Sequence, residues 1–343
     1  MKTPDRPSSA PLLALGLSFW SAKALLCAVE LGVFAALAEG PRTLEDLTAA
    51  LKLQGRGAED FFDALVSLGL LERGDHTYAN TAAVAAFLVP DGPSYIGGAL
   101  EMANARTYPL WGKLTEALRT GHPQNEAPAK QDYYGSLNRD KERLRTFLRG
   151  MTGLSMSASA AIAAKLPWTN YETFVDVGGA QGVLAIQLAE AHAHLSGASF
   201  DLPPVGPFFE ENVSAHGLTP RLRFYAGDFL VDPLPPADVL IMGHVLHNWS
   251  LEQKKLLIRK AYEALNEGGM LVIYEALIDD DRRRNSFGLL MSLHMLLVTP
   301  GGFVFTGAQC REWLAEAGFT ETRVEHLDGP DWAVIGVKTA RPV

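Results

Sequence analysis

Short runs of β-branched residues alternate with helical segments from Thr173 to the end of the chain. That alternation is typical of a parallel sheet covered by helices on both faces. We expect seven strands: Thr173–Val177, Ala198–Leu202, Leu222–Ala226, Val239–Met242, Met270–Glu275, Thr322–Glu325 and Trp332–Val337. The sequence therefore predicts an α/β domain with a seven-stranded, mostly parallel sheet.

The first half of the chain has a helical pattern. Apolar residues occupy most faces of the segment from Ser21 to Glu39, as in a helix buried in a domain or dimer interface. Further helices are expected from Thr43 to Lys52, where Asp46 completes a capping box, and from Ala58 to Gly69. Gly74-Asp75 then separates two short strands in a hairpin pattern. Together these elements predict a winged-helix-like domain.

A winged helix can bind DNA or mediate dimerisation, and charge separates the two interpretations. The helix from Ala58 carries Glu59, Asp60 and Asp63, and no cluster of Lys or Arg accompanies it. The net charge of the chain is -9, which opposes binding to a phosphate backbone. We therefore favour a homodimer formed through this domain and no nucleic-acid partner, with a transcription regulator as the less favoured alternative.

At 343 residues the chain is longer than one core usually supports. We expect a dimerisation domain at 1–100, a helical connector at 101–165 that contributes to a substrate pocket, and a Rossmann-like catalytic domain at 166–343. The connector should hold one helix from Tyr108 to Arg119, a loop at Gly121–Asn125, and a second helix from Lys141 towards Ala164.

Composition also bounds the location of the protein. We find no apolar run long enough to span a bilayer, and the stretch Pro11–Leu17 lacks the basic flank of a signal peptide. The cysteines, Cys27 and Cys310, are far apart, and neither has a Cys or His at metal-ligand spacing. We expect a cytoplasmic protein with no membrane partner, no disulfide and no metal.

The strongest local motif is the segment from Phe174 to Gly182, in which a strand runs into glycines and then into a helix. Glycines let the backbone turn sharply and approach a ligand, while the free N–H groups of the helix start attract an anion. Dinucleotide enzymes space their glycines as G-x-G-x-x-G, whereas here Asp176 precedes Gly178 and Gly179. The motif alone is weak evidence.

Acidic residues end the next two strands in chain order. Asp201 lies where a carboxylate can accept hydrogen bonds from two ribose hydroxyls. The alternative is that Asp201 has only a structural role, as a turn residue. Asp228 and Phe229 can offer an acceptor to an amino group and an aromatic face to a purine. Taken in order they indicate a nucleoside site, because open α/β sheets bind ligands at this edge.

A histidine and a glutamate follow the fourth and fifth strands. His247 directly precedes the turn that begins the helix at Leu251, and Glu275 ends a strand. An imidazole held by a carboxylate is the arrangement of a general base. We select His247 over His244, which we interpret as structural.

At these residues the chain resembles the class I S-adenosylmethionine-dependent small-molecule O-methyltransferases of the caffeic acid and hydroxyindole type, especially their bacterial natural-product relatives. The resemblance covers nearly the whole chain. It implies a methionine site at Asp176, Gly178 and Gly179, a ribose site at Asp201 and Leu202, and an adenine site at Asp228 and Phe229. It also implies that His247 is the base, that Glu275 orients it, and that S-adenosylhomocysteine is the product.

The sequence departs from the family pattern near the base. Val304 occupies the position at which the plant enzymes of the family have a second glutamate. Asn248 replaces the usual aspartate in the substrate region. The family methionines that clamp an aromatic acceptor match Met151 and Met295, for which core filling is an equal alternative.

These residues predict methyl transfer to a hydroxyl, which we expect to be phenolic, of a small aromatic or polyketide-like metabolite. Catalytic roles fall to His247 and Glu275. Transfer to carbon or nitrogen, and a relative that binds the cofactor without transferring methyl, are the alternatives.

Overall fold

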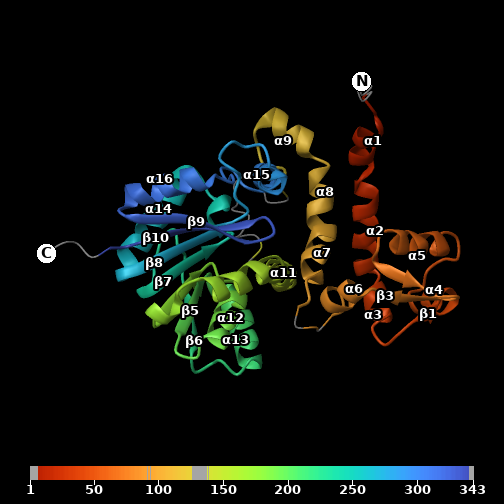
Figure 1. Ribbon diagram of the computed structural model, residues 1–343, viewed down its shortest axis with the longest axis horizontal. Coiled ribbons are helices and arrows are strands. Elements are labelled where there is room, and N and C mark those ends of the chain that lie inside the picture. The colour runs from red at the N-terminus through yellow and green to blue at the C-terminus, as the bar shows by residue number, and fades with distance from the viewer. Residues whose placement is uncertain (1–6, 91, 93, 126–136, 138, 340–343) are drawn as a thin grey trace, which may run out of the picture. The chain divides into compact units, whose positions relative to one another are not determined.

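The computed structural model describes residues 7–90, 92, 94–125, 137 and 139–339. The chain divides into two compact units, residues 1–107 and 108–343. Figure 1 follows the chain from the first unit in red to the end of the second in blue.

The second unit contains a seven-stranded sheet in the order β6-β5-β4-β7-β8-β10-β9. Its strands are β4 (Thr173–Val177), β5 (Ser196–Asp201), β6 (Leu222–Ala226), β7 (Ala237–Gly243), β8 (Leu265–Glu275), β9 (Glu321–Asp328) and β10 (Asp331–Val337). The first five strands in the spatial order are parallel, whereas β10 runs antiparallel to both β8 and β9. All seven strands expected from the sequence are present, and the predicted fold class is confirmed.

Helices cover both faces of this sheet (Figure 1). One face packs against α11 (Lys141–Lys165), α12 (Val183–Ala191) and α13 (Gly206–Ala215). The other packs against α14 (Leu251–Ala264) and α16 (Gly307–Ala317). Because strand side chains alternate between faces, each side of the sheet contributes its own apolar cluster. Three short 3₁₀ segments complete the connections: η2 (Trp168–Asn170), η3 (Pro203–Val205) and η4 (Leu246–Asn248).

A smaller helical group in the second unit differs from the sequence prediction. The single helix expected from Tyr108 to Arg119 is two helices, α8 (Tyr108–Trp111) and α9 (Leu114–Thr120), because the chain leaves the helical conformation at Lys113. Both helices contact α15 (Ser286–Val298). They enclose a separate apolar cluster with the start of α11.

The first unit combines short helices with a three-stranded sheet of order β1-β3-β2. Its elements are α1 (Ala10–Leu17), α2 (Phe19–Glu30), α3 (Val33–Ala36), β1 (Arg42–Thr43), α4 (Leu44–Ala50), α5 (Ala58–Ser67), β2 (Leu71–Arg73), β3 (Thr77–Asn80), α6 (Ala82–Phe87), α7 (Gly97–Met102) and the π-helix η1 (Ala103–Thr107). The predicted hairpin is present, with β1 as an additional strand. The helix expected from Ser21 to Glu39 is interrupted at Gly32, whose φ of 74° lies in the left-handed region.

The expectation of no bilayer-length apolar run is wrong. Ala10–Glu30 is a 21-residue helical stretch of mean hydropathy 1.8, and only 11% of its most apolar window is buried. The apolar stretch recognised in the sequence ends at Leu17, but only Ser18 separates α1 from α2. The two helices together therefore form one long apolar stretch. Leu12, Leu13 and Trp20 are more than half exposed. An exposed face of this kind marks an interaction surface.

Both cysteines are free thiols. Cys27 on α2 is partly buried, and Cys310 on α16 is fully buried. Burial raises the pKa of the Cys310 thiol well above its ordinary value, and the nearby Glu275 charge adds to this effect.

Candidate active site

Backbone hydrogen bonds join the carboxyl ends of the neighbouring parallel strands. Gly178 N–H donates to Phe200 O at 2.8 Å, and Gly227 N–H donates to Asp201 O at 2.9 Å. On the other side of β4, His244 N–H donates to Tyr274 O at 3.0 Å. The ends of β6, β5 and β4 and those of β7 and β8 are therefore fixed in place at one edge of the sheet, where open α/β sheets bind ligands.

The glycine turn after β4 has no room for side chains. Gly178 has a φ of 76°, and a Cβ there would lie 2.7 Å from Cγ2 of Val245. A Cβ on Gly179 would lie 2.5 Å from Oγ of Ser199 and 2.7 Å from Oδ2 of Asp176. Real Cβ atoms do not approach other atoms so closely, so the turn requires glycine at both positions. Without side chains at these positions, a ligand can approach the backbone of the turn closely.

Two acids lie beside this turn, of which Asp176 is buried and Asp201 is partly buried. Among the described residues, none donates a hydrogen bond to the Asp176 carboxylate, and burial followed by the charge of Asp201 raises its pKa to about 7. Burial raises the pKa of Asp201 to about 6, although the N–H groups of Leu202 and Ala180 donate to it at 2.7 and 3.0 Å. A buried carboxylate without a donor is stabilised by a cation. Asp176 is therefore suited to bind a cationic group of a ligand.

The segment after β6 supplies an aromatic ring next to the same turn. The Phe229 ring lies 3.8 Å from the position of a Cβ on Gly178, and it meets Trp249 edge-on with centroids 5.7 Å apart. Asp228, in contrast, accepts the Leu230 N–H at 2.9 Å. Its carboxylate thus forms a local turn and keeps one oxygen without a described donor.

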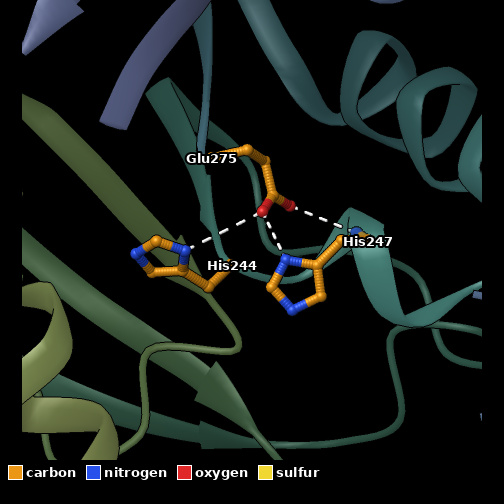
Figure 2. Close-up of side chains that lie close together, drawn as sticks. All are labelled: His244, His247 and Glu275. Carbon is orange, nitrogen blue, oxygen red and sulfur yellow. Dashed lines mark hydrogen bonds and ion pairs between the residues drawn. The ribbon is translucent and has the colours of Figure 1, made fainter. Parts of the chain in front are cut away.

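His247 and Glu275 form a buried pair (Figure 2). Oε2 of Glu275, at the end of β8, lies 2.5 Å from Nδ1 of His247 on η4, and Oε1 accepts the His247 backbone N–H at 3.2 Å. Burial would raise the pKa of Glu275, but His247 and His244 outweigh it and lower that pKa to about 2. Nε2 of His247 has no partner among the described residues and points away from Glu275 (Figure 2). The pair can therefore accept a proton at Nε2.

The structure places two further residues beside this pair: His244, which the sequence analysis interpreted as structural, and Asp331, which it did not single out. Nδ1 of His244 lies 3.8 Å from Oε2 of Glu275, and its Nε2 lies 3.8 Å from Oδ2 of Asp331. Asp331 begins β10, which runs antiparallel to β8 and places Trp332 opposite Glu275. The sequence carries no local signal for Asp331 as a neighbour of His244, because the contact comes from strand pairing.

Ligand atoms of His244, His247 and Glu275 all lie within 4.8 Å of one another, which is a spacing that could also hold a metal ion.

A buried lysine lies behind this cluster. Nζ of Lys254 donates to Trp249 O at 2.5 Å and lies 3.4 Å from the centroid of the Phe303 ring. Burial lowers its pKa to about 7, against the attraction of Glu275. Val304, where the resemblance places a second glutamate, is buried and apolar.

The three residues expected to contact substrate lie in different surroundings. The Asn248 amide donates to His244 O at 3.0 Å and to Val245 O at 3.2 Å, so its N–H groups are occupied by the backbone. Met295 is buried on α15, whereas Met151 on α11 is half-buried. Substrate contact by these three residues stays a prediction.

Family models match most of the chain. One for an O-methyltransferase domain covers residues 111–320, and one for an O-methyltransferase dimerisation domain covers residues 13–90. The chain belongs to the O-methyltransferase family. The resemblance drawn from the sequence, the methyltransferase activity and the S-adenosylmethionine cofactor are thereby confirmed at the level of the family.

Known relatives extend over nearly the full length. The chain is 44% identical over 328 residues to the tetracenomycin polyketide synthesis 8-O-methyl transferase TcmO of Streptomyces glaucescens, covering 95% of this chain and 96% of that protein. It is 38% identical to the N,N-dimethyltransferase OxyT of Streptomyces rimosus, with coverages of 95% and 96%. The crystal structure of human N-acetylserotonin methyltransferase in complex with SAM matches with a TM-score of 0.90 at 27% identity, covering 99% of this chain and all of that one.

Proposed function

We propose that this protein methylates a phenolic hydroxyl of a small aromatic or polyketide-like metabolite, with His247 as the general base and Glu275 holding its imidazole. The buried 2.5 Å contact between Nδ1 of His247 and Glu275 carries the proposal. It fixes the tautomer that leaves Nε2 free to accept a proton. The polyketide O-methyltransferase among the relatives supports the substrate class.

The residues at the edge of the sheet fit S-adenosylmethionine. Asp176 offers an unpaired buried carboxylate to an ammonium group, and Gly178 and Gly179 leave space that side chains would fill. Asp201 would receive the ribose hydroxyls beside Leu202, and Phe229 would face the adenine, with Asp228 near its amino group. When bound, the cofactor supplies a methyl group on a positively charged sulfur.

The residues of the chain then have two tasks. A phenol has a pKa near 10 and a histidine one near 6.5, so complete proton transfer before attack would cost about 5 kcal/mol. Glu275 reduces this cost because its charge stabilises the imidazolium of His247 as it forms. The rest of the reduction in the activation barrier comes from holding the reacting atoms in line, which can supply about 7–11 kcal/mol.

Replacement of the base tests the mechanism. His247→Ala should lower kcat by about 10²- to 10⁴-fold while the Kd for S-adenosylmethionine, measured by calorimetry, stays the same. His216→Ala is the matched control, because His216 also pairs with a carboxylate, Glu190 at 2.8 Å, but on the exposed surface. Loss of cofactor binding in His247→Ala would refute the role assigned to this residue.

A substrate panel tests the acceptor. Labelled cofactor is incubated with phenols, naphthols and aromatic amines, and the products are identified by mass spectrometry. We expect label on oxygen. Label on nitrogen alone would support the activity named for OxyT, and cofactor binding without any labelled product would support a non-methylating relative.

We also propose that the protein is a cytoplasmic homodimer assembled through the first unit. The dimerisation model matches residues 13–90, and the exposed side chains of Leu13 and Trp20 lie within them. A second copy would remove this apolar surface from water. A DNA-binding role is less favoured, because Arg73 is engaged by Asp63 and Glu59.

A further inference from the structure

Four titratable side chains, from the segment after β7, the end of β8 and the start of β10, form one row that is almost completely buried. Asp331, His244, Glu275 and His247 follow one another with contacts of 3.8, 3.8 and 2.5 Å. His244 is 11% exposed and Asp331 8% exposed at the side chain, and Glu275 is fully buried. Figure 2 shows the Glu275 carboxylate between the two imidazoles. A charge in such a place interacts strongly with its neighbours, because little water screens it.

The backbone at His244 is held in an uncommon conformation. Its φ of 54° lies in the left-handed region, which is rare for residues other than glycine. The His244 N–H donates to Tyr274 O at 3.0 Å, and the imidazole meets the Tyr274 ring edge-on with centroids 5.0 Å apart. A conformation of this kind persists only where the surroundings fix it. The ring of His244 is therefore directed at Glu275 by the end of β8 itself.

We propose that His244 is a positioning residue, which contacts the same Glu275 oxygen, Oε2, as His247 and is itself flanked by Asp331. This inference rests on the proposed role of His247 as the base. Asp331 thus supplies a second acid to this cluster and acts on Glu275 through the imidazole of His244.

Electrostatics agrees with this arrangement. Burial lowers the pKa of His244, but Glu275 and Asp331 outweigh it and raise that pKa above its ordinary value. The groups facing His244 are Glu275 and the Tyr274 ring from β8, Asp331 from β10, and His247 from η4. A cationic His244 would lie between the carboxylates of Glu275 and Asp331 and be attracted by both.

The test uses His244→Asn and Asp331→Asn in the full-length protein. Asparagine tolerates the left-handed conformation, so the first change removes the imidazole with little strain on the backbone. We expect His244→Asn to lower kcat about tenfold with the cofactor Kd and the Tm unchanged. His216→Asn is the matched control and should change none of these values.

A double-mutant cycle separates positioning from a purely structural effect. Asp331→Asn should lower kcat in the wild-type background and have no further effect in His244→Asn, since Asp331 acts through that imidazole. An equal effect of Asp331→Asn in both backgrounds would overturn the proposal. Wild-type kcat in His244→Asn, or a loss of kcat that only follows a fall in Tm, would also overturn it.

An NMR measurement keeps this test independent of turnover. The Nδ1 proton of His247, hydrogen-bonded to Glu275, should give a downfield resonance that His247→Gln removes. We expect that resonance to broaden in His244→Asn, because the carboxylate is less well held. If it stays sharp, His244 does not position Glu275. If it broadens as expected but no acceptor is methylated, the proposed function fails while the positioning role stands.

Discussion

Glu275 holds His247 at two points: Oε2 lies 2.5 Å from the ring Nδ1, and Oε1 accepts the backbone N–H of the same residue at 3.2 Å. One carboxylate therefore fixes both the ring and the segment that carries it. An imidazole on a short 3₁₀ turn is thereby oriented by a residue at the end of a central strand of the sheet.

Glu275→Gln should reduce kcat by about 10²- to 10⁴-fold, because the amide cannot stabilise an imidazolium by charge. The side chain keeps its size, so cofactor affinity should not change. Steady-state kinetics with calorimetry checks both values. Glu190→Gln, at the exposed partner of His216, is the control and should have wild-type activity. A Glu275→Gln enzyme as fast as wild type would contradict the role of this carboxylate.

The affinity for S-adenosylmethionine should rise with pH between about pH 5 and pH 7. The raised pKa of Asp176, about 7, means that a proton must leave before the cofactor ammonium can pair with the carboxylate. Below that pKa the gain approaches about tenfold per pH unit. Calorimetry across this range measures the slope. In Asp176→Asn the cofactor should bind weakly, and the pH dependence should be much reduced.

The same residue should lower the stability of the ligand-free protein at neutral pH. A carboxyl whose folded pKa lies above its unfolded pKa favours folding when protonated, so its contribution is lost as pH rises from about 4 to about 7. Asp176→Asn should therefore have a higher Tm than wild type at pH 8 and an equal one at pH 4, measured by scanning calorimetry. A lower Tm at pH 8 would indicate that the carboxylate has a stabilising partner.

Gly179→Ala should weaken cofactor binding by more than tenfold, because its Cβ would lie 2.5 Å from Ser199 Oγ and 2.7 Å from Asp176 Oδ2. The turn must shift to relieve these contacts. Gly55→Ala, whose Cβ would have no neighbour within 4 Å, serves as the control. Equal affinity in the two variants would show that the turn is more adaptable than its contacts indicate.

Removal of divalent metal should leave activity unchanged. His244, His247 and Glu275 are close enough for a metal site, but the 2.5 Å contact between His247 and Glu275 is that of a hydrogen bond. Dialysis against EDTA followed by kinetics tests this. Loss of activity that zinc restores would assign the cluster to a metal and remove His247 as the base.

Trp20→Glu combined with Leu13→Asp should convert the dimer to a monomer, since both side chains are more than half exposed on the apolar stretch Ala10–Glu30. Sedimentation velocity measures the change. Leu118→Asp, at an exposed position on α9, is the control. Cosedimentation of the wild type with lipid vesicles would instead assign this stretch to a membrane.

Local patterns predicted the sheet because its strands are short runs, most of them rich in apolar or β-branched residues, that alternate with helical segments. Elements defined by pairing were harder to predict. The two-residue strand β1 exists only through its partner β3, and Asp331 reaches His244 only because β10 returns along β8. Gly32 interrupts an otherwise continuous apolar pattern, and periodicity does not reveal a residue with φ of 74°. The residues from the glycine turn to Glu275 could be assigned to one edge from the sequence because strand ends in parallel sheets share an edge, and their roles stay predictions.

The two thiols differ in a way that serves experiment. Thiol reagents attack the thiolate, and Cys310 is both fully buried and held in its protonated form. Cys27 on α2 is partly exposed. A maleimide dye should therefore attach at Cys27 alone. The wild-type protein thus has a single labelling site for fluorescence measurements of assembly.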